Sequence, residues 1–112
     1  MTTGVTAPLG FRAAGITAGL KESGKPDLAV VVNDGPSSAA AAVFTSNRCK
    51  AHPVLWSEQA MKGGTAKAVV LNSGGANCYS GPGGFAATHR TAEVAAELLG
   101  IEPIDVQVCS TG

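Results

Sequence analysis

The sequence predicts an α/β or α+β fold in which helices pack against a sheet. Gly and Pro divide the chain into short segments, which suits alternating elements joined by turns. Residues 28–32 form a continuous, largely β-branched run (L-A-V-V-V), which is typical of a strand that is covered on both faces. Residues 85–99 have the apolar spacing of an amphipathic helix. The predicted order is strand, strand, strand, helix, strand, helix, strand, which indicates helices layered on a sheet.

Several short apolar segments are predicted to be strands. Residues 39–45 are rich in Ala, which favours helices. Their ending in V-F-T and the strong turn N-D-G-P at 33–36 nevertheless favour a strand at hairpin-like spacing from the preceding one. Residues 104–108 alternate between apolar and polar, as a half-buried strand does. The predicted strands are 11–18, 28–32, 39–45, 66–72 and 104–108.

Two segments are predicted to be helices. Residues 51–56 are predicted to be a short extended segment around Pro53. Ser57 is then predicted to be the N-cap of a short helix over 57–62, which ends at the two following glycines. The longer helix covers 85–99 and ends at Gly100. Its predicted buried face consists of Phe85, Ala92, Ala95, Ala96 and Leu99.

Composition sets the limits on size and function. The 112 residues suffice for one domain, which the sequence assigns to residues 1–112 as a single, incomplete unit, because a strand that runs into S-T-G is a poor place for a domain to end. The formal net charge is zero and basic residues do not cluster, which argues against nucleic acid as a partner. No apolar run approaches the roughly 18 residues that a membrane-spanning helix needs.

The N-terminus lacks the basic and apolar segments of a secretory signal. The three Cys residues show neither zinc-ligand nor disulfide spacing, so reduced thiols in the cytoplasm are the simplest interpretation.

Residues 72–84 (N-S-G-G-A-N-C-Y-S-G-P-G-G) are the first candidate for a functional segment. Glycines let backbone N–H groups converge, and the N-terminus of the following helix favours negative charge. The segment nevertheless lacks both the P-loop pattern and the dinucleotide pattern. A plain turn between strand and helix, with glycines at positive φ, is the alternative.

Residues 110–112 (S-T-G), at the end of the last predicted strand, are the second candidate. A Thr followed by a flexible Gly can present hydrogen-bond donors to a developing oxyanion, although a three-residue pattern is also common in ordinary turns.

A nucleophilic Cys is the third candidate. A Cys–His pair can form in space without sequence proximity, but Cys is more often a small buried residue. The side chains concerned are Cys49, Cys78, Cys109, His52 and His89. His89 itself is expected to be packed or half-exposed. Trp56 is expected to anchor the core or an interface. Four glutamates are expected to be solvated surface charges: Glu58, Glu93, Glu97 and Glu102.

Four segments together resemble the ornithine acetyltransferase family (bifunctional glutamate N-acetyltransferase, ArgJ). Residues 43–48 (V-F-T-S-N-R) with 51–54 (A-H-P-V) are similar to one family segment, and 72–77 (N-S-G-G-A-N) with Gly81 to another. Residues 109–112 (C-S-T-G) and the opening 5–11 (V-T-A-P-L-G-F) also fit. The resemblance covers nearly the whole chain, in order.

The resemblance implies a fold and an activity. The fold is a layered α/β sandwich of the ornithine acetyltransferase (DmpA/ArgJ-like) type, of which this chain is a partial domain, the N-terminal part of an α chain. Family members transfer an acetyl group from N2-acetylornithine to glutamate in arginine biosynthesis, and some also use acetyl-CoA as donor; no resident cofactor or metal is implied. Thr111 and Gly112 match the residues that form the family's oxyanion hole.

The family's nucleophile is a Thr that autocatalytic cleavage exposes at the start of a β chain, and no such segment is present here. The 112 residues alone are therefore expected to be inactive, and the partner is the β chain from the same precursor, in a heterotetramer of two α and two β chains. Two other classes remain open: a related N-terminal-nucleophile hydrolase of the aminopeptidase type, and a non-catalytic assembly domain.

Overall fold

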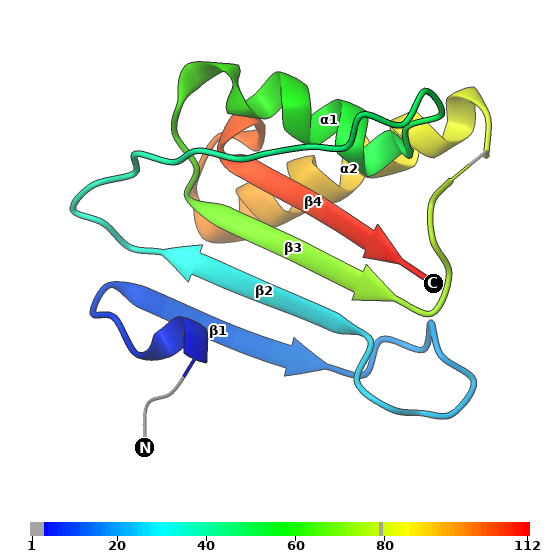
Figure 1. Cartoon of the computed structure of the whole chain (residues 1–112). Helices are drawn as coiled ribbons and strands as arrows, with labels where there is room; N and C mark the ends of the chain where they lie inside the picture. Colours follow the sequence, from blue (N-terminus) through cyan, green and yellow to red (C-terminus); the bar gives the residue numbers. More distant parts are fainter. Residues whose placement is uncertain (1–3, 79) are drawn as a thin grey trace.

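Two helices lie on one face of a four-stranded mixed sheet (Figure 1). The computed structural model describes residues 4–78 and 80–112. Short 3-10 turns occur at Gly4–Thr6, Met61–Gly63 and Pro103–Asp105. The strands and helices are β1 (Phe11–Ile16), β2 (Leu28–Asn33), α1 (His52–Ala60), β3 (Ala68–Ser73), α2 (Pro82–Leu99) and β4 (Val106–Thr111). The predicted α/β class with helices against a sheet is confirmed.

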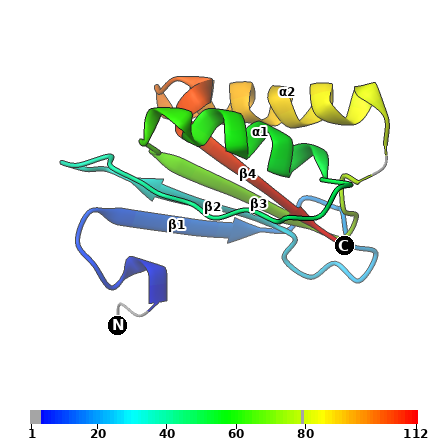
Figure 2. The same ribbon diagram turned by 45° about the horizontal axis from the view of Figure 1, so that its top comes forward.

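The strands lie side by side in chain order. β1 and β2 form an antiparallel pair, and β2 pairs antiparallel with β3. β3 and β4 are parallel, with Val70 opposite Val108, and α2 makes the crossover that a parallel pair requires. Viewed along the sheet, both helices lie on the same side of it, above β3 and β4 (Figure 2). The carboxyl ends of β3 and β4 therefore meet at one edge of the molecule.

The core lies between the helices and the β3–β4 half of the sheet. Val106 and Ala92 are completely buried, and Ala96 is 1% exposed. Small side chains on this face of α2 let the helix approach the sheet closely. The predicted apolar face of α2 is confirmed, because its other members, Phe85, Ala95 and Leu99, pack against this core.

Helix α1 covers the outer edge of β4. The Trp56 indole Nε1 donates to the Val106 carbonyl at 2.9 Å, and Ser57 Oγ lies 3.1 Å from both the amide nitrogen and the carbonyl oxygen of Val108. Trp56 is thus an anchor of the core, one of the two roles predicted for it, whereas the prediction of Ser57 as an N-cap is wrong. The helix begins at His52, because Pro53 fits a first turn, where its missing N–H costs nothing. The predictions of an extended 51–56 and a helix over 57–62 are corrected accordingly.

The predicted strand over 39–45 is wrong. Only Ala39 makes a single bridge, to Thr65, and Val43 is 97% exposed. Both edges of β2 are already taken by β1 and β3, so a hairpin partner has no place beside it. The outer edge of β4 is covered by α1. The segment therefore crosses the molecule without joining the sheet (Figure 1).

The other half of the helix-facing sheet surface, over β1 and β2, carries a groove of about 1000 Å³ beside α2. β1 is exposed along its length and β2 is half-buried, so the prediction that residues 28–32 are covered on both faces is not met in this structure. On α2, Val94 is 39% and Leu98 82% exposed along the groove.

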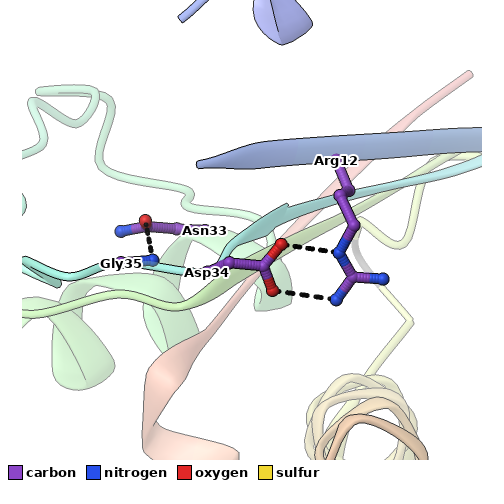
Figure 3. Close-up of polar contacts among 4 residues, drawn as sticks. All are labelled: Arg12, Asn33, Asp34 and Gly35. Carbon is purple, nitrogen blue, oxygen red and sulfur yellow. Dashed lines mark hydrogen bonds and ion pairs between the residues drawn. The ribbon is translucent and has the colours of Figure 1, made fainter. Parts of the chain in front are cut away.

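The turn after β2 is fixed by polar contacts (Figure 3). Asp34 accepts two hydrogen bonds from the Arg12 guanidinium, at 2.6 and 2.9 Å, and Gly35 N–H donates to Asn33 Oδ1 at 2.9 Å. The hydrogen bonds and charge of Arg12 lower the pKa of Asp34. The turn predicted at 33–36 is therefore confirmed, and an ion pair ties it to β1.

The loop between β1 and β2 is organised around Asp27, which is only 3% exposed. Its carboxylate accepts hydrogen bonds from the backbone N–H groups of Ala18 (2.6 Å), Leu20 (2.6 Å) and Lys21 (2.9 Å). These bonds, those of Ala18 and Lys21 first, lower the pKa of Asp27 below its ordinary value of 3.8.

Protonation of Asp27 is expected to destabilise the fold at acid pH. Because its folded-state pKa is lowered, its contribution is fully present above the unfolded-state pKa and is lost as the pH falls through the folded-state pKa. We expect Asp27→Asn to be less stable than the wild type at neutral pH, and this difference to shrink below about pH 4. Urea unfolding between pH 3 and 7 measures it, with the exposed Glu22→Gln as control. A constant difference across that range would contradict the prediction.

Candidate functional site

The carboxyl ends of β3 and β4 form the candidate site. Thr111 is the last residue of β4 and lies opposite Ser73, the last residue of β3. Both Thr111 and Gly112 are exposed. In α/β sheets, ligands bind in the crevice beyond the carboxyl ends of the strands. The two residues that the sequence singled out therefore lie at this end of the sheet, accessible to a small molecule.

Gly112 lies against the loop that leaves β3. A Cβ atom added to Gly112 would overlap the backbone nitrogen of Ala76. The loop bearing Ala76 is the glycine-rich segment 72–84, so the structure brings the two sequence candidates together. Glycine at 112 is thus needed for the close approach of two backbones, in addition to its flexibility.

Ser110 connects the end of β4 to this loop. Its hydroxyl donates to Asn72 Oδ1 at 2.6 Å and accepts from the Asn77 backbone N–H at 3.1 Å. Asn72 is also its partner in the β3–β4 register. By strand alternation, the Ser110 side chain is on the helix side with Val106 and Val108, and the Thr111 side chain is on the other side.

Asn77 connects the same loop to the start of α2. Its Nδ2 donates to the Gly84 carbonyl at 2.7 Å and to Thr88 Oγ1 at 2.9 Å, and its Oδ1 accepts from the Ser80 hydroxyl. Thr88 is 2% exposed. The loop is therefore bound at both ends, to β4 and to α2.

Helix α2 begins three residues earlier than predicted. Gly81, at φ 73°, is its N-cap and Pro82 is in the first turn, where its fixed φ favours a helix. The predicted positive φ of the loop glycines is confirmed at Gly74 and Gly81. Gly84 has another function: an added Cβ would overlap Ser80 Oγ, His52 Cδ2 and Asn77 Oδ1. Its lack of a side chain lets the first turns of α1 and α2 meet.

The two histidines pack against aromatic rings. His52 makes an edge contact with Phe85, with 6.4 Å between centroids, and among the described residues its buried Nδ1 has no hydrogen-bond partner. The His89 ring stacks on the Trp56 ring with 4.8 Å between centroids, and His89 Nε2 lies 3.8 Å from Glu93 Oε1. The prediction that His89 is packed or half-exposed is confirmed.

The cysteines do not form a nucleophile with these histidines. In the described part of the chain, none of the three sulfur atoms hydrogen bonds to His52 or His89, and all three thiols are free. Partial burial raises the pKa of Cys109, which keeps its thiol protonated at neutral pH. Residues 4–78 and 80–112 also contain no group of three His, Cys, Asp or Glu side chains that could hold a metal ion.

The prediction that the four glutamates are solvated is confirmed for Glu97 and Glu102, which are exposed. It is wrong for Glu58, whose carboxylate is half-buried and pairs with Lys50 at 2.6 Å. Glu93 stays at the surface, where it approaches His89 and Arg90.

A second groove, of about 470 Å³, follows β4 toward the candidate site. It lies between the irregular segment 40–44 and the start of α1, and it reaches Cys109 and Ser110. Its lining includes Val43 and Phe44 of the motif 43–48, and Ala51, Pro53 and Val54 of the motif 51–54. These motifs therefore form a wall beside the end of β4.

The arrangement suits stabilisation of a developing negative charge better than nucleophilic attack. Two exposed residues at a strand end, held by a bound loop, can present preorganised donors to an oxyanion. Sequence reasoning gave individual roles to Thr111 and Gly112, whereas Ser110, Asn77 and Gly84 were named only as members of the candidate segments 110–112 and 72–84. The only sequence signal for Asn77 was its place in N-S-G-G-A-N.

Over residues 4–78 and 80–112, neither helix has the length and apolar character needed to cross a bilayer.

Comparisons with known proteins show which family the chain resembles. A family model described as the ArgJ family matches residues 12–112. The arginine biosynthesis bifunctional protein ArgJ of Streptomyces coelicolor is 68% identical over 108 residues, which is 96% of this chain and 28% of that protein. The ArgJ protein of Mycobacterium tuberculosis is 60% identical over 97% of this chain and, again, 28% of that protein. The chain thus spans about 28% of the length of these curated relatives.

Solved structures agree with the fold. Ornithine acetyltransferase from Mycobacterium tuberculosis, solved in complex with ornithine, matches with a TM-score of 0.96 and 58% identity over 97% of this chain and 59% of that chain. The ArgJ protein of Bacillus halodurans matches with a TM-score of 0.85 and 36% identity, over 93% of this chain and 54% of the other.

Proposed function

Because the chain belongs to the ArgJ family, we propose that the complete protein transfers an acetyl group from N2-acetylornithine to glutamate, and that this segment supplies the oxyanion hole. The observation that carries the proposal is the family match over residues 12–112, which includes Thr111 and Gly112. The exposure of both residues at the carboxyl end of β4 supports it. So does the relative solved with ornithine bound.

The proposed reaction has two half-reactions. A Thr nucleophile outside this segment attacks the acetyl carbonyl through its hydroxyl, whose proton passes to the free amine of the same Thr. The tetrahedral oxyanion is stabilised at Thr111 and Gly112, and ornithine leaves when its amine takes up that proton. The amine of glutamate then attacks the acetyl-Thr ester, the C–O bond to Thr breaks, and one amine proton passes by way of the Thr amine to the Thr oxygen. N-acetylglutamate leaves and the Thr hydroxyl is restored. In this scheme acetyl-CoA is an alternative donor, and no resident cofactor takes part.

The proposal extends to the processing and assembly of the complete protein. Autocatalytic cleavage of one precursor gives an α chain, which contains these residues, and a β chain that starts with the nucleophilic Thr. Two of each assemble in the cytoplasm. The low charge of the segment, 14% of residues, and the uncovered groove beside α2 are compatible with such extensive contacts.

The test is an assay of the complete protein for acetyl transfer from N2-acetylornithine to glutamate, together with denaturing gel electrophoresis. Activity with two bands supports a self-cleaving acetyltransferase. An uncleaved, inactive protein would refute the proposal, and hydrolysis of amino-acid amides without acetyl transfer would instead support the aminopeptidase-like alternative.

A further inference from the structure

The end of β4 is held in place by one hydroxyl group. Ser110 immediately precedes Thr111 and Gly112, and its side chain both donates and accepts a hydrogen bond. The donated bond goes across the sheet to Asn72, and the accepted bond comes from the backbone of Asn77 in the loop. A serine hydroxyl has one hydrogen to donate, so these two bonds fix its orientation.

The loop that Ser110 holds is the one against which Gly112 packs. Ala76, whose backbone lies next to Gly112, directly precedes Asn77. The side chain of Asn77 is itself fixed by Gly84 and Thr88 in the first turns of α2. A chain of contacts thus runs from the buried part of α2, through Asn77 and Ser110, to the exposed end of β4.

We infer that Ser110 is a positioning residue for acetyl transfer: by joining loop residue Asn77 to β4, its hydroxyl holds Thr111 and Gly112 in the orientation that receives the oxyanion. The inference rests on the proposed function. Its physical basis is that oxyanion stabilisation depends on donors fixed before the reaction. A misplacement of about 1 Å can lower a rate about a hundredfold.

The alternative is that Ser110 only stabilises the fold. Ser110→Ala leaves the Asn77 backbone N–H and Asn72 Oδ1 without this partner, so some loss of stability is expected in either case. A purely structural role, however, would lower the amount of folded enzyme and leave the kcat of the folded fraction unchanged. The two roles therefore differ in kcat per folded active site.

The experiment compares variants of the complete enzyme, with kcat and KM for N2-acetylornithine measured per folded active site. We expect Ser110→Ala to lower kcat at least about tenfold, as loss of a group that orients site residues typically does, with KM changed less than about twofold. Ser110→Thr keeps the hydroxyl and is expected to restore most of kcat. Thr17→Ala is the matched control, because it also removes a hydroxyl hydrogen bond, to the Gly24 carbonyl at 3.2 Å, in the exposed loop between β1 and β2.

Amide hydrogen exchange adds a readout that does not depend on activity. In Ser110→Ala, exchange at Asn77 and at Gly112 is expected to accelerate together, while the amides of β2 exchange as in the wild type. If Ser110→Ala does not accumulate as folded enzyme, Asn72→Ala removes only the acceptor of the Ser110 hydroxyl and is expected to lower kcat at least about threefold, a smaller loss because the hydroxyl can turn to the Gly75 carbonyl at 3.4 Å.

The outcomes separate this inference from the proposed function. An active wild type and an impaired Thr111→Ala, with Ser110→Ala equal to Thr17→Ala in kcat, would overturn the inference and leave the proposed function standing. Unchanged exchange at Gly112 in Ser110→Ala, or unchanged kcat in a folded Asn72→Ala, would overturn it as well. A complete wild-type enzyme without acetyl transfer would overturn both.

Discussion

Thr111→Ala in the complete enzyme is expected to lower kcat for acetyl transfer about a hundredfold to a thousandfold, the usual effect of removing one oxyanion donor. The variant should remain as stable as the wild type. Thr111 is exposed, and its side chain lies on the face of the sheet away from the core formed by Val106 and Val108. The loss should fall on kcat more than on KM, because the missing interaction forms with the charge of the tetrahedral state.

Thr111→Ser keeps the hydroxyl group and is the conservative control, for which we expect most of the activity to remain. The measurements are steady-state kinetics with N2-acetylornithine and glutamate, and thermal unfolding of each variant. Equal turnover in Thr111→Ala and the wild type would remove the assigned role from Thr111.

Gly84→Ala is expected to have the largest effect on stability, a loss of about 1–3 kcal/mol from overpacking. An added methyl group would overlap His52 of α1 and the side chains of Ser80 and Asn77. The His52 ring packs on Phe85, so it cannot give way without disturbing that contact. Because Asn77 also holds the loop to Ser110, we expect the disturbance to reach the candidate site.

The neighbouring Gly83→Ala is a matched control. Gly83 is in the same turn of α2, and an added Cβ would meet nothing within 4 Å. Alanine is the better helix former, so this variant should be more stable than the wild type by about 0.5–1 kcal/mol. Urea unfolding of both variants measures the contrast, and equal stabilities would show that the approach of α1 and α2 does not depend on Gly84.

Much of the fold could be predicted because local pattern and tertiary environment agree. The β-branched run beginning at Leu28, the alternation around Val106 and the apolar face of α2 all indicate the elements that formed. The predictions were wrong where tertiary contacts, and not the local sequence, determined the structure of a segment. The hydroxyl of Ser57 could have capped a helix locally, but it bonds to Val108 at the sheet edge instead. Residues 39–45 end in the strand-like V-F-T, but both edges of β2, the expected hairpin partner, are occupied.

The candidate site was predictable only in part. Thr111 and Gly112 could be singled out because they match a family motif, and the structure places them at a strand end, while their catalytic role stays a prediction. Ser110, Asn77 and Gly84 lie in the predicted candidate segments, but their individual contacts could not be predicted from sequence. Their contacts join the β4 end, the loop and the starts of both helices, and Ser110 and Asn77 are 33 positions apart. No local pattern encodes such a pairing.

The hydrogen bonds between α1 and β4 also affect the order in which parts of the chain fold during synthesis. Trp56 and Ser57 bond to residues that lie 50 and 51 positions later in the chain. When α1 leaves the ribosome, its partner strand has not yet been made, whereas β1 and β2 are close in sequence and can pair early. We therefore expect α1 to stay undocked on the nascent chain until β4 emerges, so that the candidate site, which the end of β4 completes, is the last part of this segment to form.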